Sequence, residues 1–354
     1  MLASLRSFAL SALLLASSPA LADPPPSRHQ RDTAEPGHLL APEPAPAPAA
    51  PVVQDYEPDP AMWRLADEDT TLYFFGTYHV LPEGFRWRTP LLEQVIAEAD
   101  EVVFESRSED EEDIDFEAVF GGSALDILAR PPVSDKLSET NREKWARIAE
   151  QMELPFFVFD RMPPSLTLLF IGVTASELEG SQSELGVETI LEEEFRAAGK
   201  PILAIEDPAA VLRNVLAIDE AFAIRLIDES LTEWDGESLV TMEDGEVVTD
   251  WSMEHDWARG DLDPDDFEEW TEDPFGEALY KVLLVDRNRA WADWIAARME
   301  QPGTVLVAVG AGHFAGPDSV QAMAAAKGLT IERLNQPVPR PASDKASAVA
   351  APAE

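Results

Sequence analysis

The sequence predicts an α/β protein with a largely parallel central sheet, built from two related halves that each carry a G-x-x-H strand end, and with a helical cap or insertion. Several short runs rich in β-branched and aromatic residues lack strict alternation, which is typical of strands covered on both faces. Helical patterns lie between these runs. Two of the runs end in the same frame, with Gly76 before His79 and Gly310 before His313.

The expected elements follow in chain order. The strands are "TLYFFGT" (71–77), "DEVVFES" (100–106), "KPILAIED" (200–207) and "TVLVAVG" (304–310). A helix over 89–100 opens with Thr89 as N-cap and Pro90 at its first position. A helix over 187–200 ends at Gly199, a residue suited to a left-handed C-terminal stop. Segment 230–270, rich in tryptophan and acidic residues, is expected to form a mostly helical insertion or cap between the sheet halves.

The chain divides into four parts by composition. Residues 1–22 have a basic start, a short apolar centre and an A-L-A ending, which predicts a signal peptide cleaved before Asp23. Residues 23–57 form a Pro/Ala-rich stretch typical of a disordered linker, and 336–354 repeat that composition as a disordered tail. The folded domain is therefore expected over 58–335.

Export and the absence of cysteine together predict the compartment. The apolar centre of the leader is too short for a membrane-spanning helix, so no stable membrane insertion is expected after cleavage. The chain has no cysteine. A lipid-modified cysteine is thus excluded, as is any disulfide. We expect a periplasmic or secreted protein that is not a lipoprotein.

The charge excludes several classes of partner. The formal net charge of −42 predicts repulsion of nucleic acid and of anionic lipid. Two acidic runs, 106–117 and 261–273, lack the glycine-punctuated spacing of a calcium loop and are expected to be solvated surface. A peptide or a small molecule remains as the expected substrate, and the sequence leaves the oligomeric state open.

Polar residues follow each of the four expected strands. These residues are His79, Glu105, Glu206 and His313. Ligands of open α/β sheets bind outside the carboxyl ends of parallel strands, so the four side chains are expected to share one crevice. A polar residue after a strand is often only the start of a loop. The use of histidine favours function, because two of the three histidines in the domain occupy the same G-x-x-H frame. His255 lacks that context and is expected to be a helical surface or packing residue.

The ordered motifs resemble the TraB/GumN family, which is related to the Tiki proteins. They are "LYFFGTYHVLPEG", "ADEVVFE", "LGVETIL", "GKPILAIE", "DRNRAWADWI" and "TVLVAVGAGHFAGPDSV". The resemblance spans about 61–334 and implies a metal-dependent peptidase. It makes His79 and His313 the paired motif histidines and Glu105 the motif glutamate. It also places Glu206 at a strand end that often carries glutamate, and Arg287 and Asn288 at the polar positions of a late helix.

Two imidazoles and a carboxylate suit a divalent transition ion such as Zn²⁺, Mn²⁺ or Co²⁺ with an open position for water. The expected metal ligands are His79, His313 and Glu105. The expected catalytic residues are Glu105, Glu206, Arg287 and Asn288, with a carboxylate as general base and Arg287 holding a substrate carboxylate or an oxyanion. No H-E-x-x-H motif is present, so the fold would have to bring the histidines together.

Three functions remain open from the sequence. The first is a periplasmic metal-dependent hydrolase (a metalloprotease) acting on peptide bonds. The second is a metal-independent, esterase-like hydrolase in which a motif histidine acts as the base. The third is a non-catalytic metal-binding or haem-binding protein, since the wider group that the sequence resembles also includes erythromycin-esterase-like hydrolases and haem-binding lipoproteins.

Overall fold

A computed structural model describes residues 52–244, 246–262, 271 and 273–339. The predicted signal peptide, most of the predicted linker and most of the predicted tail lie outside these residues. The end of the linker is described, and there the Tyr56 hydroxyl lies 2.7 Å from Nδ1 of His255. His255 lies in a helix and contacts Tyr56 and Phe85.

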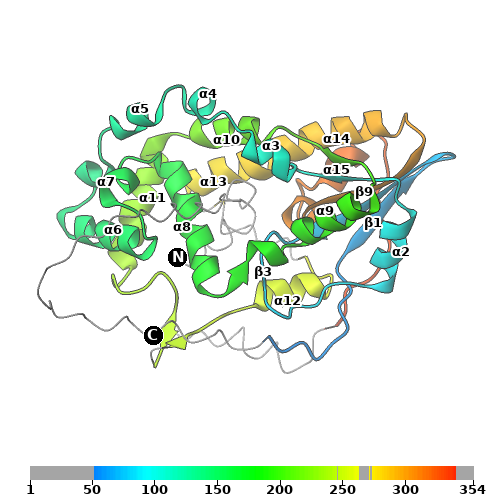
Figure 1. The fold of residues 1–354 in the computed structure, drawn as a ribbon, viewed down its shortest axis with the longest axis horizontal. Helices are drawn as coiled ribbons and strands as arrows, with labels where there is room; N and C mark the ends of the chain where they lie inside the picture. Colours follow the sequence, from blue (N-terminus) through cyan, green and yellow to red (C-terminus); the bar gives the residue numbers. More distant parts are fainter. Residues whose placement is uncertain (1–51, 245, 263–270, 272, 340–354) are drawn as a thin grey trace, which may run out of the picture.

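The described residues form a mixed α/β fold around a central sheet (Figure 1). In spatial order its strands are β10 (Glu332–Arg333), β1 (Met62–Ala66), β2 (Thr70–Thr77), β9 (Gly303–Gly310), β4 (Glu101–Phe104) and β6 (Ile202–Ala204). Four neighbouring strands, β2, β9, β4 and β6, run parallel to one another. Each of them coincides with a predicted strand. The two strands at the other side, β1 and β10, are antiparallel.

Helices cover both faces of the sheet, which explains the continuous apolar character of the strands. One face packs against α2 (Pro90–Glu98), α9 (Val187–Ala198) and α12 (Ser252–Ala258). The other packs against α14 (Asp286–Arg298) and α15 (Val320–Ala325). The predicted helix signals are confirmed, because the Thr89 side chain accepts a hydrogen bond from the Leu92 amide and Gly199 ends α9 with a φ of 67°.

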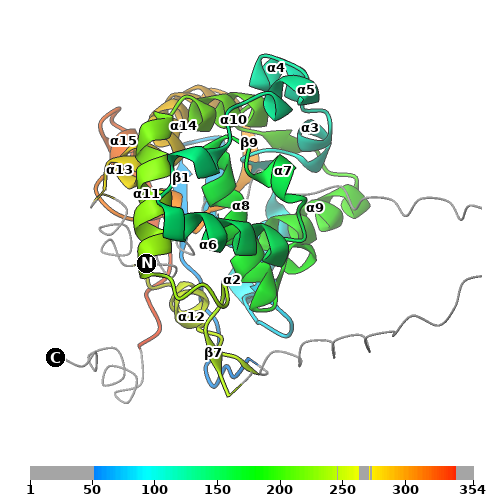
Figure 2. The same ribbon diagram turned by 90° about the vertical axis from the view of Figure 1, so that its left-hand side faces the viewer.

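A second core of helices lies beside the sheet, and we call it the helical lobe (Figures 1 and 2). Its members are α6 (Glu139–Gln151), α7 (Phe156–Phe159), α8 (Pro164–Leu178), α10 (Pro208–Leu216), α11 (Glu220–Glu233) and α13 (Pro274–Tyr280). A π-helical turn, η6 (Lys281–Val285), joins α13 to α14. One helix, α8, is buried on nearly all sides, because its apolar residues are spread around the whole helix.

The remaining elements are short. They are β3 (Leu81–Pro82), α3 (Ser108–Glu112), α4 (Phe116–Phe120), α5 (Ala124–Leu128), η2 (Val133–Lys136), β5 (Ser181–Gln182), η3 (Ser183–Leu185), β7 (Met242–Glu243), β8 (Glu246–Val247) and η7 (Ala311–Phe314). The helical cap is built mainly from 139–178, 208–233 and 274–280, outside most of the predicted segment 230–270. Between 234 and 262 the chain instead forms the β7–β8 hairpin and α12, because acidic, glycine and threonine residues there interrupt any helical repeat.

The two ends of the described domain meet. The Asn335 side chain donates to the carbonyl oxygens of Asp59 and Pro60 and accepts from the Met62 amide. Among the described residues, none of the helices combines the length and hydropathy that crossing a membrane requires.

Candidate active site

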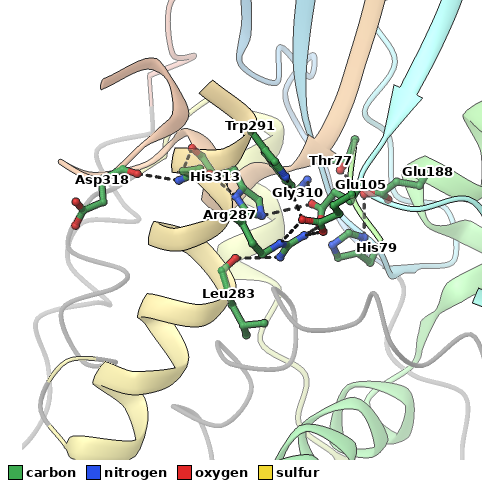
Figure 3. Close-up of polar contacts among 12 residues, drawn as sticks. Thr77, His79, Glu105, Glu188, Leu283, Arg287, Trp291, Gly310, His313 and Asp318 are labelled. Carbon is green, nitrogen blue, oxygen red and sulfur yellow. Dashed lines mark hydrogen bonds and ion pairs between the residues drawn. The ribbon is translucent and has the colours of Figure 1, made fainter. Parts of the chain in front are cut away.

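The carboxyl ends of the four parallel strands bring the predicted polar residues together. Pairing of β2 with β9 sets Thr77 opposite Gly310, so the two G-x-x-H motifs leave the sheet side by side. Glu105 and Glu206 follow the adjacent strands, and the amide of Glu206 donates to the Glu105 carbonyl. We call the rim formed by His79, Glu105, Glu206 and His313 the carboxyl edge (Figure 3). The structure thus places all four residues together, whereas their catalytic roles stay predictions.

His79 is held by Glu188, a residue that the sequence did not single out. Its Nδ1 lies 2.8 Å from Oε1 of Glu188, and the Thr77 hydroxyl donates to the same oxygen. Nε2 of His79 is buried and has no hydrogen-bond partner. Burial by itself would lower the pKa of His79, but the Glu188 carboxylate, with a smaller contribution from Glu105, raises that pKa to about 9.

His313 is held in a different way. Its Nδ1 lies 2.6 Å from Oδ1 of Asn288, whose amide nitrogen donates to the Asp318 carbonyl at 2.8 Å. The ring packs against Trp291 at 4.0 Å between centroids. Burial, together with the nearby cations Arg287 and His79, lowers the pKa of His313 well below its ordinary value. At neutral pH, His313 is therefore neutral, whereas His79 is protonated.

Glu105 lies at the centre and is 1% exposed. Its Oε1 accepts the Gly310 amide at 2.6 Å and lies 3.6 Å from Nε2 of His313. Its Oε2 accepts from Nη2 of Arg287. Glu105 therefore links the end of β9, one motif histidine and the late helix.

Arg287 joins the two carboxylates. Its Nη2 donates to Glu105 and Glu206, its Nε donates to Glu206 at 2.9 Å, and its Nη1 donates to the Leu283 carbonyl in the π-helical turn. The Trp291 indole also donates to Glu206, at 3.0 Å. Burial raises the pKa of Glu206, and the neighbouring Glu105 adds to this effect against the opposing pull of Arg287.

Gly310 marks the point where the side chains converge. A Cβ atom at this residue would lie 3.0 Å from Oε1 of Glu105, 3.4 Å from Nε2 of His79 and 3.7 Å from Cδ2 of His313. Glycine thus leaves open the one position that all three side chains face.

The donors match a divalent transition ion by type. Each histidine binds its orienting partner through Nδ1, which leaves Nε2 directed toward Glu105, an arrangement common around metal-ligating imidazoles. The orphaned Nε2 of His79 fits the same use. Within the described part of the chain, however, no three His, Asp or Glu side chains stand close enough together to hold an ion as they are.

Sequence reasoning missed Thr77, Glu188 and Trp291. The available signal for Glu188 was the glycine that precedes its helix. A Cβ at Gly186 would lie 2.1 Å from the His79 carbonyl oxygen, and the Val187 amide donates to the Tyr78 carbonyl at 2.9 Å. A glycine immediately before a helix thus marked a close approach to the first G-x-x-H loop.

A sequence profile of the TraB/PrgY/gumN family matches residues 61–333, which contain every residue of the carboxyl edge. The chain belongs to this family. The family relation confirms the resemblance drawn from the motifs.

Two proteins that are named as uncharacterized are similar to part of this chain. The chain is 23% identical over 191 residues to "Uncharacterized protein YbaP" of Escherichia coli (strain K12), covering 54% of this chain and 67% of YbaP. The YbaP protein of Shigella flexneri matches to the same extent. No solved structure matches significantly.

Proposed function

We propose that this TraB/PrgY/gumN protein is a metal-dependent hydrolase that cleaves peptide bonds at the carboxyl edge. The observation that carries the proposal is the buried Nε2 of His79, which has no partner and faces Glu105 and His313 around Gly310. A buried nitrogen without a partner costs free energy, which a ligand, a metal or a reacting group would offset.

The ion would be held by His79, His313 and Glu105, the expected ligands. The three side chains surround Gly310, although among the described residues they do not stand at ligating distances. A bound divalent ion supplies Lewis-acid polarisation of a carbonyl and lowers the pKa of a water molecule.

The remaining polar residues would serve by position and by proton transfer. Glu206 suits a general acid or base, because burial raises its pKa above the ordinary value of a glutamate. Arg287 directs its Nε and both of its Nη atoms toward protein acceptors. These contacts favour a role in fixing the two carboxylates over direct substrate binding. Asn288 would orient the His313 ring.

A second candidate is a metal-independent, esterase-like hydrolase. It is favoured by the opposite pKa changes of the two histidines, which leave His313 neutral and His79 protonated at neutral pH. A neutral imidazole can take a proton from water while an adjacent imidazolium stabilises the developing oxyanion.

One experiment separates these functions. Purified protein is analysed for bound metal and is incubated with peptide and ester libraries, with and without a chelator. Peptide cleavage that the chelator abolishes and Mn²⁺, Zn²⁺ or Co²⁺ restores supports the first function. Ester cleavage that resists the chelator and is lost in His313→Ala supports the second. Bound metal or haem without hydrolysis indicates a binding protein. If the protein holds neither metal nor haem and hydrolyses no substrate, both proposals are overturned.

The proposed compartment is the periplasm or the exterior of the cell. It follows from the leader in residues 1–22 and the absence of cysteine. A peptide substrate in that compartment would meet the domain without crossing a membrane.

A further inference from the structure

The contact between Glu188 and His79 shows which nitrogen of the histidine ring points toward Glu188. An ionised carboxylate only accepts hydrogen bonds. Oε1 of Glu188 lies 2.8 Å from Nδ1 of His79 and also receives the Thr77 hydroxyl. Nδ1 must therefore carry a hydrogen, and Nε2 is the ring atom left to face Glu105.

The backbone fixes Glu188 relative to His79. Glu188 lies in the first turn of α9, and the start of this helix is hydrogen-bonded to the loop that carries the histidine, from the Val187 amide to the Tyr78 carbonyl. Gly186 allows the close contact with the His79 carbonyl. The side chains of His79 and Glu188 are 8% and 17% exposed, so bulk water competes little for the contact.

The other histidine has a neutral partner. Asn288 holds His313 by a carboxamide oxygen, whereas Glu188 holds His79 by a carboxylate. A carboxylate behind an imidazole makes the far nitrogen a stronger electron donor, and losing such a partner typically weakens metal binding or activity about 10–100-fold. The two rings are thus oriented alike but are electronically unequal.

We infer that Glu188 is a positioning residue of the carboxyl edge, which fixes the Nδ1–H form and the direction of the His79 ring so that Nε2 faces Glu105. Its kinetic consequences rest on the proposed function, but its effect on the ring does not. Glu188 acts through His79 and needs no contact with substrate.

The test compares Glu188→Gln and Glu188→Ala with Glu192→Gln. Glu192 is a matched control, because it lies one turn further along α9, is similarly buried and bonds Ser108 and Arg196 away from the histidines. The first readout is the His79 Nδ1 proton in ¹H–¹⁵N NMR spectra of protein labelled at histidine nitrogen. We expect a strongly downfield signal in the wild type and in Glu192→Gln, a changed one in Glu188→Gln, and its loss in Glu188→Ala.

The second readout is kinetic and uses Mn²⁺ affinity by calorimetry together with kcat and KM on a cleaved peptide. We expect Glu188→Gln to lose about 10–100-fold in Mn²⁺ affinity and kcat with little change in KM, while Glu192→Gln stays near wild type. An unchanged His79 signal in both Glu188 variants overturns the inference. If the wild type binds no Mn²⁺ and cleaves no peptide, the proposed function fails, and the NMR comparison alone decides the role of Glu188. Glu188→Gln keeps the shape of the side chain, so it serves if Glu188→Ala does not fold.

Discussion

Thr77 and Gly310 lie opposite each other at the last register position shared by β2 and β9. The two strands run parallel and end together, so His79, two residues after Thr77, and His313, three residues after Gly310, leave the same edge of the sheet. On the other side of β9, the Gly310 amide donates to Glu105, which follows β4.

Removing either motif histidine should stop hydrolysis. We expect His79→Ala and His313→Ala each to lower kcat about 10²–10⁴-fold. The double variant should be scarcely worse than either single one, because the residues act as a unit. Steady-state kinetics on a peptide substrate check this. Multiplicative losses in the double variant would show that the two rings act independently.

Glu105→Gln tests the central carboxylate while preserving volume. Arg287 would keep Glu206 as a partner, so the fold should persist, whereas the negative charge facing His313 disappears. We expect kcat to fall on the order of a hundredfold or more, with a melting temperature close to wild type. Activity near that of the wild type would remove Glu105 from both proposed mechanisms.

Gly310→Ala tests the point of convergence. The backbone at Gly310, with φ −47° and ψ 134°, accepts alanine without strain. The added methyl group would lie 3.0 Å from Oε1 of Glu105 and displace it or His79. We expect a loss of activity on the order of a hundredfold. Circular dichroism provides the control, since a substitution that unfolds the protein would leave the site untested. A folded and fully active variant would show that Glu105, His79 and His313 do not act together around Gly310.

Stability should depend on pH through the His79–Glu188 pair. The pKa of His79 rises from 6.5 to about 9 on folding, so the pair stabilises the fold fully below pH 6.5 and loses this contribution as pH rises through about 9. The contribution is on the order of 3 kcal/mol. Urea unfolding between pH 6 and 9.5 measures it. In Glu188→Gln this decline should be largely absent, and an equal decline in both proteins would assign it to other groups.

The leader makes a separate prediction. Protein recovered from the periplasmic fraction should begin at Asp23, because cleavage is expected after the A-L-A sequence. N-terminal sequencing of that fraction checks the cleavage site. Recovery with Met1 retained in a membrane fraction would show that the leader is not cleaved.

Much of the carboxyl edge was predictable because two sequence patterns mark a buried parallel strand. One is a continuous apolar run, and the other is a polar residue at its end. His79, Glu105, Glu206 and His313 were found in this way. Glu188 was not, because a glutamate in the first turn of a helix is common and only the fold brings it to His79.

Other features leave still weaker traces in sequence. The π-helical turn at 281–285 reads as an ordinary apolar helix, although its Leu283 carbonyl receives Arg287. The antiparallel strands β1 and β10 are short, and their pairing depends on contacts across the whole domain. Distances between His313, Asn288 and Glu105 likewise follow from tertiary packing and not from spacing along the chain.

The contacts of Asn335 with Asp59 and Pro60 bring the start and the end of the folded domain together. Met62 pairs with Phe75 near the carboxyl end of β2, so the chain enters and leaves the domain at the same edge that carries His79 and His313. A tether attached before Asp59 or after Asn335 would therefore hold the domain with the edge that carries the two motif histidines turned toward its anchor.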